Sequence, residues 1–201
     1  MENIDPIIEF LKGKEVEFKS FPLETDKTKT RFHMKYFWDI IKPEGNILNM
    51  GIMKKTPGSI VDIIDNKNVK SILHFELDVP HKIKISSKEK VLWKTDFCKY
   101  VSNCKSSSFD GVVIWHGPEH MPKKDGYKAI QEGIRVAKKW ILVSCPWNRL
   151  KGWKQEPKGK EHLGHKSTWD ENDYLNFGLR TFSIGEKGIY PGYLFGWKIK
   201  E

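Results

Sequence analysis

Residues 108–148 read SFDGVVIWHGPEHMPKKDGYKAIQEGIRVAKKWILVSCPWN, and this stretch decides the fold. It opens with a short apolar run, Gly111–Trp115, which carries the β-branched residues typical of a buried strand. A second apolar run, Trp140–Val143, stops before Cys145 and Pro146. We therefore predict a buried strand near each end of the stretch.

Between the two runs, the sequence has the spacing of one helical face. Apolar residues recur at intervals of three and four, at Tyr127, Ile130, Ile134 and Ala137. Lys138 and Lys139 follow, and their charge suits the C-terminal end of a helix dipole. Strand, helix and strand in succession form a βαβ unit with parallel strands. Ligands of such sheets bind beyond the carboxyl ends of the strands, so we expect function at residues 115–120 and 144–148.

The composition is that of one globular domain. The chain has 201 residues, of which 38% are hydrophobic and 30% charged, enough for a sizeable core. It lacks the long apolar run of a membrane span and the pattern of a signal peptide. Its three cysteines form neither a disulfide framework nor a CxxC zinc pair. We expect a single cytoplasmic domain over residues 1–201 that has no contact with membranes.

The charge of the chain raises the question of nucleic acid binding. The net charge is +9, but 31 of the 35 basic residues are lysine, because arginine occurs only at positions 31, 135, 149 and 180. Arginine is the preferred residue for recognition of phosphate and guanine. The predominance of lysine over arginine therefore favours a small-molecule or glycan ligand over nucleic acid. The composition predicts no particular oligomeric state.

The rest of the chain supplies further strands and two segments of unusual composition. Residues 1–30 form an N-terminal leader, within which residues 14–21 alternate like a strand. Residues 149–169 form a long loop, and loops of this length are usually functional or disordered. Residues 98–108 read as a polar connection and residues 170–177 as a short helix. The remaining strands are predicted at Asn46–Met50, Ser71–Glu76 and Val91–Trp93, with an antiparallel pair at Leu179–Ile184 and Tyr193–Ile199.

Several of these segments resemble the class I S-adenosylmethionine-dependent methyltransferases. Phe109–Ile114 and Glu119–Met121 are similar to the fourth strand and the E-H-hydrophobic turn of many small members. Lys138–Pro146 resembles their fifth strand. His165–Trp169 and the following Asp173–Leu179 resemble the H-x-S-x-W and D-aromatic region of one subgroup. The resemblance implies an α/β fold, a three-layer Rossmann-like sandwich with a mostly parallel sheet and a C-terminal antiparallel hairpin.

The segment after the first strand departs from the family pattern. In the family this strand leads into a glycine-rich loop, because the absence of Cβ atoms lets the backbone approach the cofactor. Here Gly51 is the only one of those glycines that remains. Met53 and Lys55 would fill the space of the others, unless the loop is rebuilt around Thr56–Ser59. The chain therefore resembles a methyltransferase with a degenerate glycine loop.

The resemblance implies that S-adenosylmethionine is the cofactor. Glu76, or Asp78 as second choice, would hold the ribose hydroxyls at the end of the second strand. Asp96 would meet the adenine amino group, and Phe97 would lie against the ring. The plainer interpretation of each acid is a solvated strand end. The expected cofactor-binding residues are Gly51, Glu76, Asp96, Phe97 and Trp115.

Three histidines mark the expected acceptor side. A histidine can take a proton from a hydroxyl or amine at neutral pH, so we assign catalysis to His116, His120 and His165. Glu119 and Trp147 are expected to contact the substrate. His116, Glu119 and His120 also have the chemistry of a metal site, but adjacent residues rarely form one without a distant ligand, which His162 or His165 of the long loop could supply. We therefore expect Glu119 to cap a helix with His120 packed beneath it, and predict no metal.

The expected function is transfer of a methyl group from S-adenosylmethionine to an unidentified oxygen or nitrogen nucleophile. Such an enzyme needs little covalent chemistry of its own, because alignment of the reactants and one base do most of the work. The alternative is a non-catalytic methyltransferase-like module that has lost cofactor binding and binds nucleic acid or an acidic partner. In the long loop, we expect Trp169 to anchor the chain to the core, whereas Trp147 would offer a stacking face.

Overall fold

The computed structural model of the chain describes residues 18–21, 38, 40–51, 66–76, 87–93, 95–148, 164–189 and 192–200. Met53, Lys55, Thr56–Ser59 and Asp78, which bear on the predicted cofactor loop and ribose contact, lie outside these residues. Most of the N-terminal leader and of the 149–169 loop lies outside them as well.

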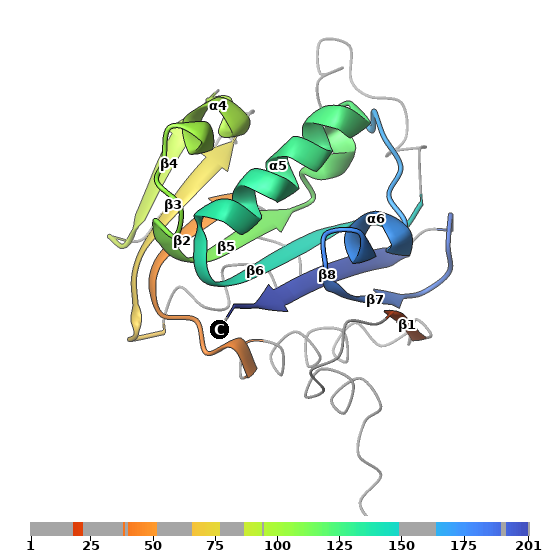
Figure 1. Cartoon of the computed structure of the whole chain (residues 1–201), viewed down its shortest axis with the longest axis horizontal. Helices are drawn as coiled ribbons and strands as arrows, with labels where there is room; N and C mark the ends of the chain where they lie inside the picture. The colour runs from red at the N-terminus through yellow and green to blue at the C-terminus, as the bar shows by residue number, and fades with distance from the viewer. Residues whose placement is uncertain are drawn as a thin grey trace, which may run out of the picture.

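The described strands form a single sheet with the order β1-β7-β8-β6-β5-β2-β3-β4 (Figure 1). Strand β8 is antiparallel to both of its neighbours, and every other neighbouring pair is parallel. The five predicted parallel strands and the antiparallel terminal pair are thereby confirmed. The strands are β1 (Phe18–Phe21), β2 (Gly45–Met50), β3 (Val69–Glu76), β4 (Glu89–Trp93), β5 (Phe109–Trp115), β6 (Ala137–Pro146), β7 (Arg180–Ile184) and β8 (Tyr193–Ile199).

The helices that the structure describes in full lie along one face of this sheet (Figure 1). They are α4 (Phe97–Ser102), α5 (Lys123–Val136) and α6 (Glu171–Leu175), with the short 3-10 helix η1 (Pro118–His120) just before α5. In the described part of the chain, no helix has the length and apolar character needed to cross a bilayer.

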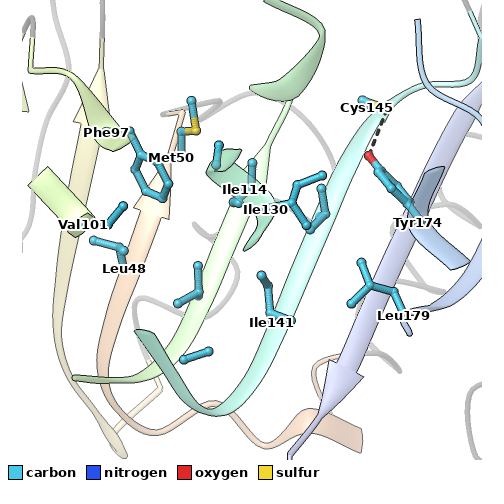
Figure 2. Close-up of a cluster of buried hydrophobic side chains, with 14 of the residues drawn as sticks. Leu48, Met50, Phe97, Val101, Ile114, Ile130, Ile141, Cys145, Tyr174 and Leu179 are labelled. Carbon is cyan, nitrogen blue, oxygen red and sulfur yellow. Dashed lines mark hydrogen bonds between the residues drawn. The ribbon is translucent and has the colours of Figure 1, made fainter. Parts of the chain in front are cut away.

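Strand alternation divides the core into two layers, because successive side chains of a strand point to opposite faces. Leu48 of β2, Ile114 of β5 and Ile141 of β6 are fully buried on the face that the helices cover, as Figure 2 shows. Ile47 and Val113, their chain neighbours, belong to the core cluster of the other face. Both faces of the central strands are therefore apolar, as a parallel sheet requires.

Two glycines allow α5 to approach the layer below it. A Cβ atom on Gly133 would lie 3.1 Å from the Cδ1 atoms of both Ile114 and Ile141. A Cβ atom on Gly126 would lie 2.4 Å from the ring of Trp169. Trp169 is fully buried, and its Nε1 donates a hydrogen bond to Ser167 Oγ at 2.9 Å. The predicted anchoring role of Trp169 is confirmed.

The boundary between α5 and β6 differs from the prediction. The helix ends at Val136 and the strand begins at Ala137, so Lys138 and Lys139 belong to β6 rather than to the helix end. Lys139 forms an ion pair with Glu44 and lies 3.7 Å from Asp110 Oδ1. The spacing of Ala137 fits the helical face, but the backbone turns extended there and pairs with β5, which the spacing alone could not reveal.

The predicted polar connection at residues 98–108 contains helix α4. Asp96 caps this helix, since its Oδ1 accepts a hydrogen bond from the Lys99 backbone N–H at 3.0 Å. Phe97 and Val101, four residues apart, are buried against the sheet. Two buried positions are too few to establish a helical period in the sequence, which is why the helix was not predicted.

Candidate functional site

Residues predicted to be functional gather at the carboxyl edge of the sheet. Gly51 follows β2, Trp115 ends β5, and His116 is the first residue after β5. Ser144, near the end of β6, pairs with Trp115 across the ladder. The edge forms because parallel strands all end on the same side, which is where ligands of open α/β sheets bind.

His116 turns the chain away from the sheet in a strained conformation. Its φ is 49°, in the left-handed region that non-glycine residues rarely adopt. Its backbone N–H donates to the Ser144 carbonyl at 2.9 Å, and its Nδ1 lies 3.1 Å from Glu119 Oε1. Backbone strain of this kind persists where the surrounding structure enforces it, and it concentrates at functional sites.

Glu119 is a buried carboxylate beside two imidazoles. Its side chain is 1% exposed, and its Oε1 also lies 3.6 Å from His120 Nε2. Burial raises the pKa of this carboxyl, but the hydrogen bond from His116 and the electrostatic effect of the two neighbouring imidazoles outweigh burial and lower the pKa below its usual value. An ionised carboxylate has no proton to donate, so His116 Nδ1 donates the hydrogen bond. In the neutral imidazole, His116 Nε2 then carries a lone pair.

Backbone hydrogen bonds hold the end of the long loop against this turn. The N–H groups of Lys166 and Ser167 donate to the Glu119 carbonyl at 2.7 and 3.2 Å. The contact brings His165 beside His120, with ring centroids 5.2 Å apart. Three predicted residues from two distant segments, Glu119, His120 and His165, thus lie together.

Gly51 is required by the packing of two strands. Its φ is 89°, and a Cβ atom there would lie 2.4 Å from the Trp115 carbonyl oxygen. Its N–H donates to the Phe75 carbonyl at 3.0 Å. Only glycine suits this position, which leaves backbone without a side chain at the tip of β2. Glu76, which ends the neighbouring strand β3, is half-buried.

Three of the other predicted residues have structural roles. Phe97 is 3% exposed, and its ring packs edge-on against Phe75 with centroids 5.3 Å apart. It belongs to the core layer under α4, whereas Trp115 belongs to the layer on the opposite face. Trp147 is 7% exposed, and its Nε1 donates to Glu171 Oε2 at 3.0 Å. The rings of Phe97 and Trp147 therefore offer little surface to a ligand, and Asp96 caps α4.

A buried polar chain that crosses three strands was not predicted from the sequence. Asn49 of β2 donates through Nδ2 to the Gly51 carbonyl at 2.6 Å and to His74 Nδ1 at 2.9 Å. His74 Nδ1 is therefore an acceptor, so Nε2 carries the proton and donates to Glu89 Oε1 at 3.0 Å. The only signal in the sequence is a polar residue inside each of two apolar runs. This chain orients the backbone at Gly51.

Several buried polar atoms at this edge have no hydrogen-bond partner among the described residues. They are Asn49 Oδ1, Trp115 Nε1, Glu119 Oε2 and Ser144 Oγ. Buried polar groups in proteins are normally paired, so each of these atoms could accept a hydrogen-bond partner from a ligand or from solvent. Tyr193 was not predicted to be functional, and its ring lies at the same edge, with its centroid 6.1 Å from that of His116.

Comparison with known proteins gives likeness in structure only. No protein-family model and no curated protein matches the sequence. A SAM-dependent methyltransferase from Archaeoglobus fulgidus has a TM-score of 0.56 at 12% identity, over 86% of this chain and 95% of that chain. A putative sarcosine dimethylglycine methyltransferase from Galdieria sulphuraria has a TM-score of 0.54 at 17% identity, over 78% of this chain and 64% of that chain.

A third similar structure was determined with SAM bound. The magnesium protoporphyrin IX methyltransferase from Synechocystis with bound SAM has a TM-score of 0.53 at 10% identity, over 87% of this chain and 81% of that chain. These likenesses agree with the parallel sheet and its single antiparallel strand. The chain therefore has the class I S-adenosylmethionine-dependent methyltransferase fold.

Proposed function

We propose that the protein transfers a methyl group from S-adenosylmethionine to an oxygen or nitrogen atom of a small-molecule or glycan acceptor. The observation that carries this proposal is the hydrogen-bonded pair of His116 and buried Glu119 at the carboxyl edge of β5. The fold alone does not fix a function, but this pair supplies a proton acceptor at the edge where ligands of such folds bind.

The residues at the tips of β2 and β3 fit S-adenosylmethionine. Gly51 presents backbone without a Cβ atom, which permits close approach of a ligand. Glu76 carries a carboxylate that suits ribose hydroxyls, and the unpaired Oδ1 of Asn49 needs a donor. When bound, S-adenosylmethionine supplies a methyl group on a sulfonium, which is reactive without further activation.

The pair of His116 and Glu119 would handle the proton that the acceptor loses. His116 Nε2 accepts this proton from the hydroxyl or amine of the acceptor, since Nδ1 is already bonded to Glu119. The buried Glu119 carboxylate then stabilises the imidazolium that results and keeps the ring in its orientation. Because Glu119 is almost fully buried, its main role here is to position His116 rather than to contact the substrate directly.

Calorimetric titration of the folded chain with S-adenosylhomocysteine tests cofactor binding. We expect saturable binding, and we expect Glu76→Gln to weaken it by about 1–3 kcal/mol through loss of a charged hydrogen-bond acceptor. Asp125→Asn is the matched control, because Asp125 is exposed on α5 and its loss removes the same charge. Its binding should equal that of the unsubstituted chain.

The alternative function makes the opposite prediction. A methyltransferase-like module that has lost its cofactor would show no heat of binding at saturating ligand, with a folded state confirmed by circular dichroism. That result would contradict the proposal and leave the binding module in its place.

A further inference from the structure

We propose that Glu119, His120 and His165 bind one divalent transition-metal ion. Each of the three offers one ligand atom, and these atoms all lie within 4.8 Å of one another. Nitrogen and oxygen ligands sit about 2.0–2.2 Å from ions such as zinc, so ligand atoms around one ion lie roughly 3–4 Å apart. Small side-chain rotations would bring the three atoms to that spacing.

The hydrogen bonding of His120 prepares it as a ligand. Its Nδ1 lies 3.3 Å from the Gly164 carbonyl oxygen, which can only accept a hydrogen bond, so Nδ1 carries the proton. The lone pair is then on Nε2, which lies 3.6 Å from Glu119 Oε1. Histidines that ligate metals commonly donate their other N–H group to a backbone carbonyl in this way, which fixes the ring and its tautomer.

The two carboxylate oxygens of Glu119 differ in their hydrogen bonding. Oε1 accepts a hydrogen bond from His116, whereas Oε2 is buried without a hydrogen-bond partner among the residues that the structure describes. A buried carboxylate oxygen without a partner is costly, and a cation at this position would satisfy it. His116 then acts as the group that orients the ligating carboxylate.

The third ligand comes from a distant part of the chain. His165 is held beside η1 because the N–H groups of the next two residues, Lys166 and Ser167, donate to the Glu119 carbonyl. No metal was expected, because the sequence alone does not place a distant ligand, His162 or His165, against the turn. The docking of residues 164–167 supplies that ligand and leads us to revise the expectation.

The ligand types select the ion. Two imidazoles and one carboxylate suit zinc, cobalt, iron or manganese, whereas magnesium and calcium prefer oxygen ligands alone. Three protein ligands leave at least one position open, as in zinc sites that bind water or substrate. An oxygen atom of a hydroxyl or carboxylate group would fill it. The site does not depend on the proposed methyl transfer, because metal binding can be measured by itself.

Titration of the untagged, chelator-stripped chain with Co²⁺ tests the proposal through visible absorption and calorimetry. We expect one ion per chain, displaced by Zn²⁺ and not by Mg²⁺. His165→Ala should weaken binding by more than about 100-fold, since loss of a ligand should exceed the 10- to 100-fold effect of a group that only orients one. His116→Gln should weaken it by about 10- to 100-fold. Lys166→Ala is the control, because its exposed side chain neighbours His165 and no ligand is removed.

Three results would overturn the proposal: no stoichiometric binding by the folded chain, binding that survives both His165→Ala and His120→Ala, or equal competition by Mg²⁺. His165→Gln provides a second variant should His120→Ala fail to fold. Titration with S-adenosylhomocysteine in chelator separates this inference from the proposed function. Cofactor binding without metal binding would contradict the metal site alone.

Discussion

His116 combines two properties in one residue, a left-handed backbone and a side chain that hydrogen-bonds to a buried carboxylate. Histidine, asparagine and aspartate adopt the left-handed region more readily than other non-glycine residues, so few replacements keep the backbone. A replacement by asparagine therefore removes the imidazole while it keeps the left-handed turn, so the two roles can be tested separately.

His116→Asn should lower kcat for methyl transfer by about 10²- to 10⁴-fold, the usual contribution of one general base. Asparagine tolerates the left-handed backbone, so the free energy of unfolding should change little. His116→Gly should lower kcat equally but should increase stability by about 1 kcal/mol, because the backbone strain is relieved. Full activity in either variant would exclude His116 as the base.

Gly51→Ala should destabilise the fold by at least about 2 kcal/mol, because it combines left-handed strain with a clash. The added Cβ would lie 2.4 Å from the Trp115 carbonyl oxygen. Gly188→Ala is the matched control, since Gly188 also has a positive φ of 80° but its Cβ would lie 3.8 Å from the nearest atom, the Asn148 carbonyl oxygen. Urea unfolding of both variants measures the difference, and equal losses would refute the role of the Trp115 contact.

At the scale of elements, one carboxylate joins α5 to α6. Asp173 of α6 accepts hydrogen bonds from Lys123 Nζ and Tyr127 Oη of α5, each at 2.5 Å. Burial raises the pKa of the Asp173 carboxyl, but these two hydrogen bonds outweigh burial and hold the pKa below its usual value. Burial and the bond to Asp173 raise the pKa of Tyr127 to about 12.

Asp173→Asn should lower the free energy of unfolding by about 1–3 kcal/mol at neutral pH. Because the carboxyl pKa is lower in the folded protein than in the unfolded chain, the ionised group stabilises the fold above about pH 4. This contribution is lost as pH falls through the folded pKa. The unsubstituted chain should therefore lose stability in acid more steeply than Asp173→Asn in urea unfolding at several pH values. Asp125→Asn, which removes an exposed carboxylate from α5, should keep the steep acid dependence.

At the scale of the whole molecule, the sheet was predictable and much of the site was not. Runs such as Gly111–Trp115 are apolar on both faces, which is typical of a buried parallel strand, and the helical spacing between two such runs favours that assignment. The rule that ligands of open α/β sheets bind beyond the carboxyl ends of the strands then directed attention to Gly51 and His116, which do lie at those ends. The contact between His120 and His165 depends on how a distant loop docks, and the buried bond between Asn49 and His74 depends on strand register. Neither is encoded in local spacing.

Removal of the last strand should disrupt the whole sheet rather than its end. Strand β8 pairs with β6 from Trp140↔Ile199 to Pro146↔Tyr193 and with β7 from Arg180↔Trp197 to Ile184↔Tyr193. A chain of residues 1–189 would leave the edge of β6 unpaired and β7 without its central neighbour. We expect this chain to aggregate, because an exposed apolar edge pairs with other chains. A monomer with native circular dichroism on size-exclusion chromatography would contradict this expectation.

The position of β8 between β6 and β7 also sets an order of events during synthesis. Strand β7 leaves the ribosome before β8, yet it can join the sheet only through β8. Strand β1, made first of all the described strands, pairs with β7 and must wait for the same event. Strands β2 to β6 can pair with one another before β8 is made, whereas β1, the earliest strand that the structure describes, can join the sheet only after β8.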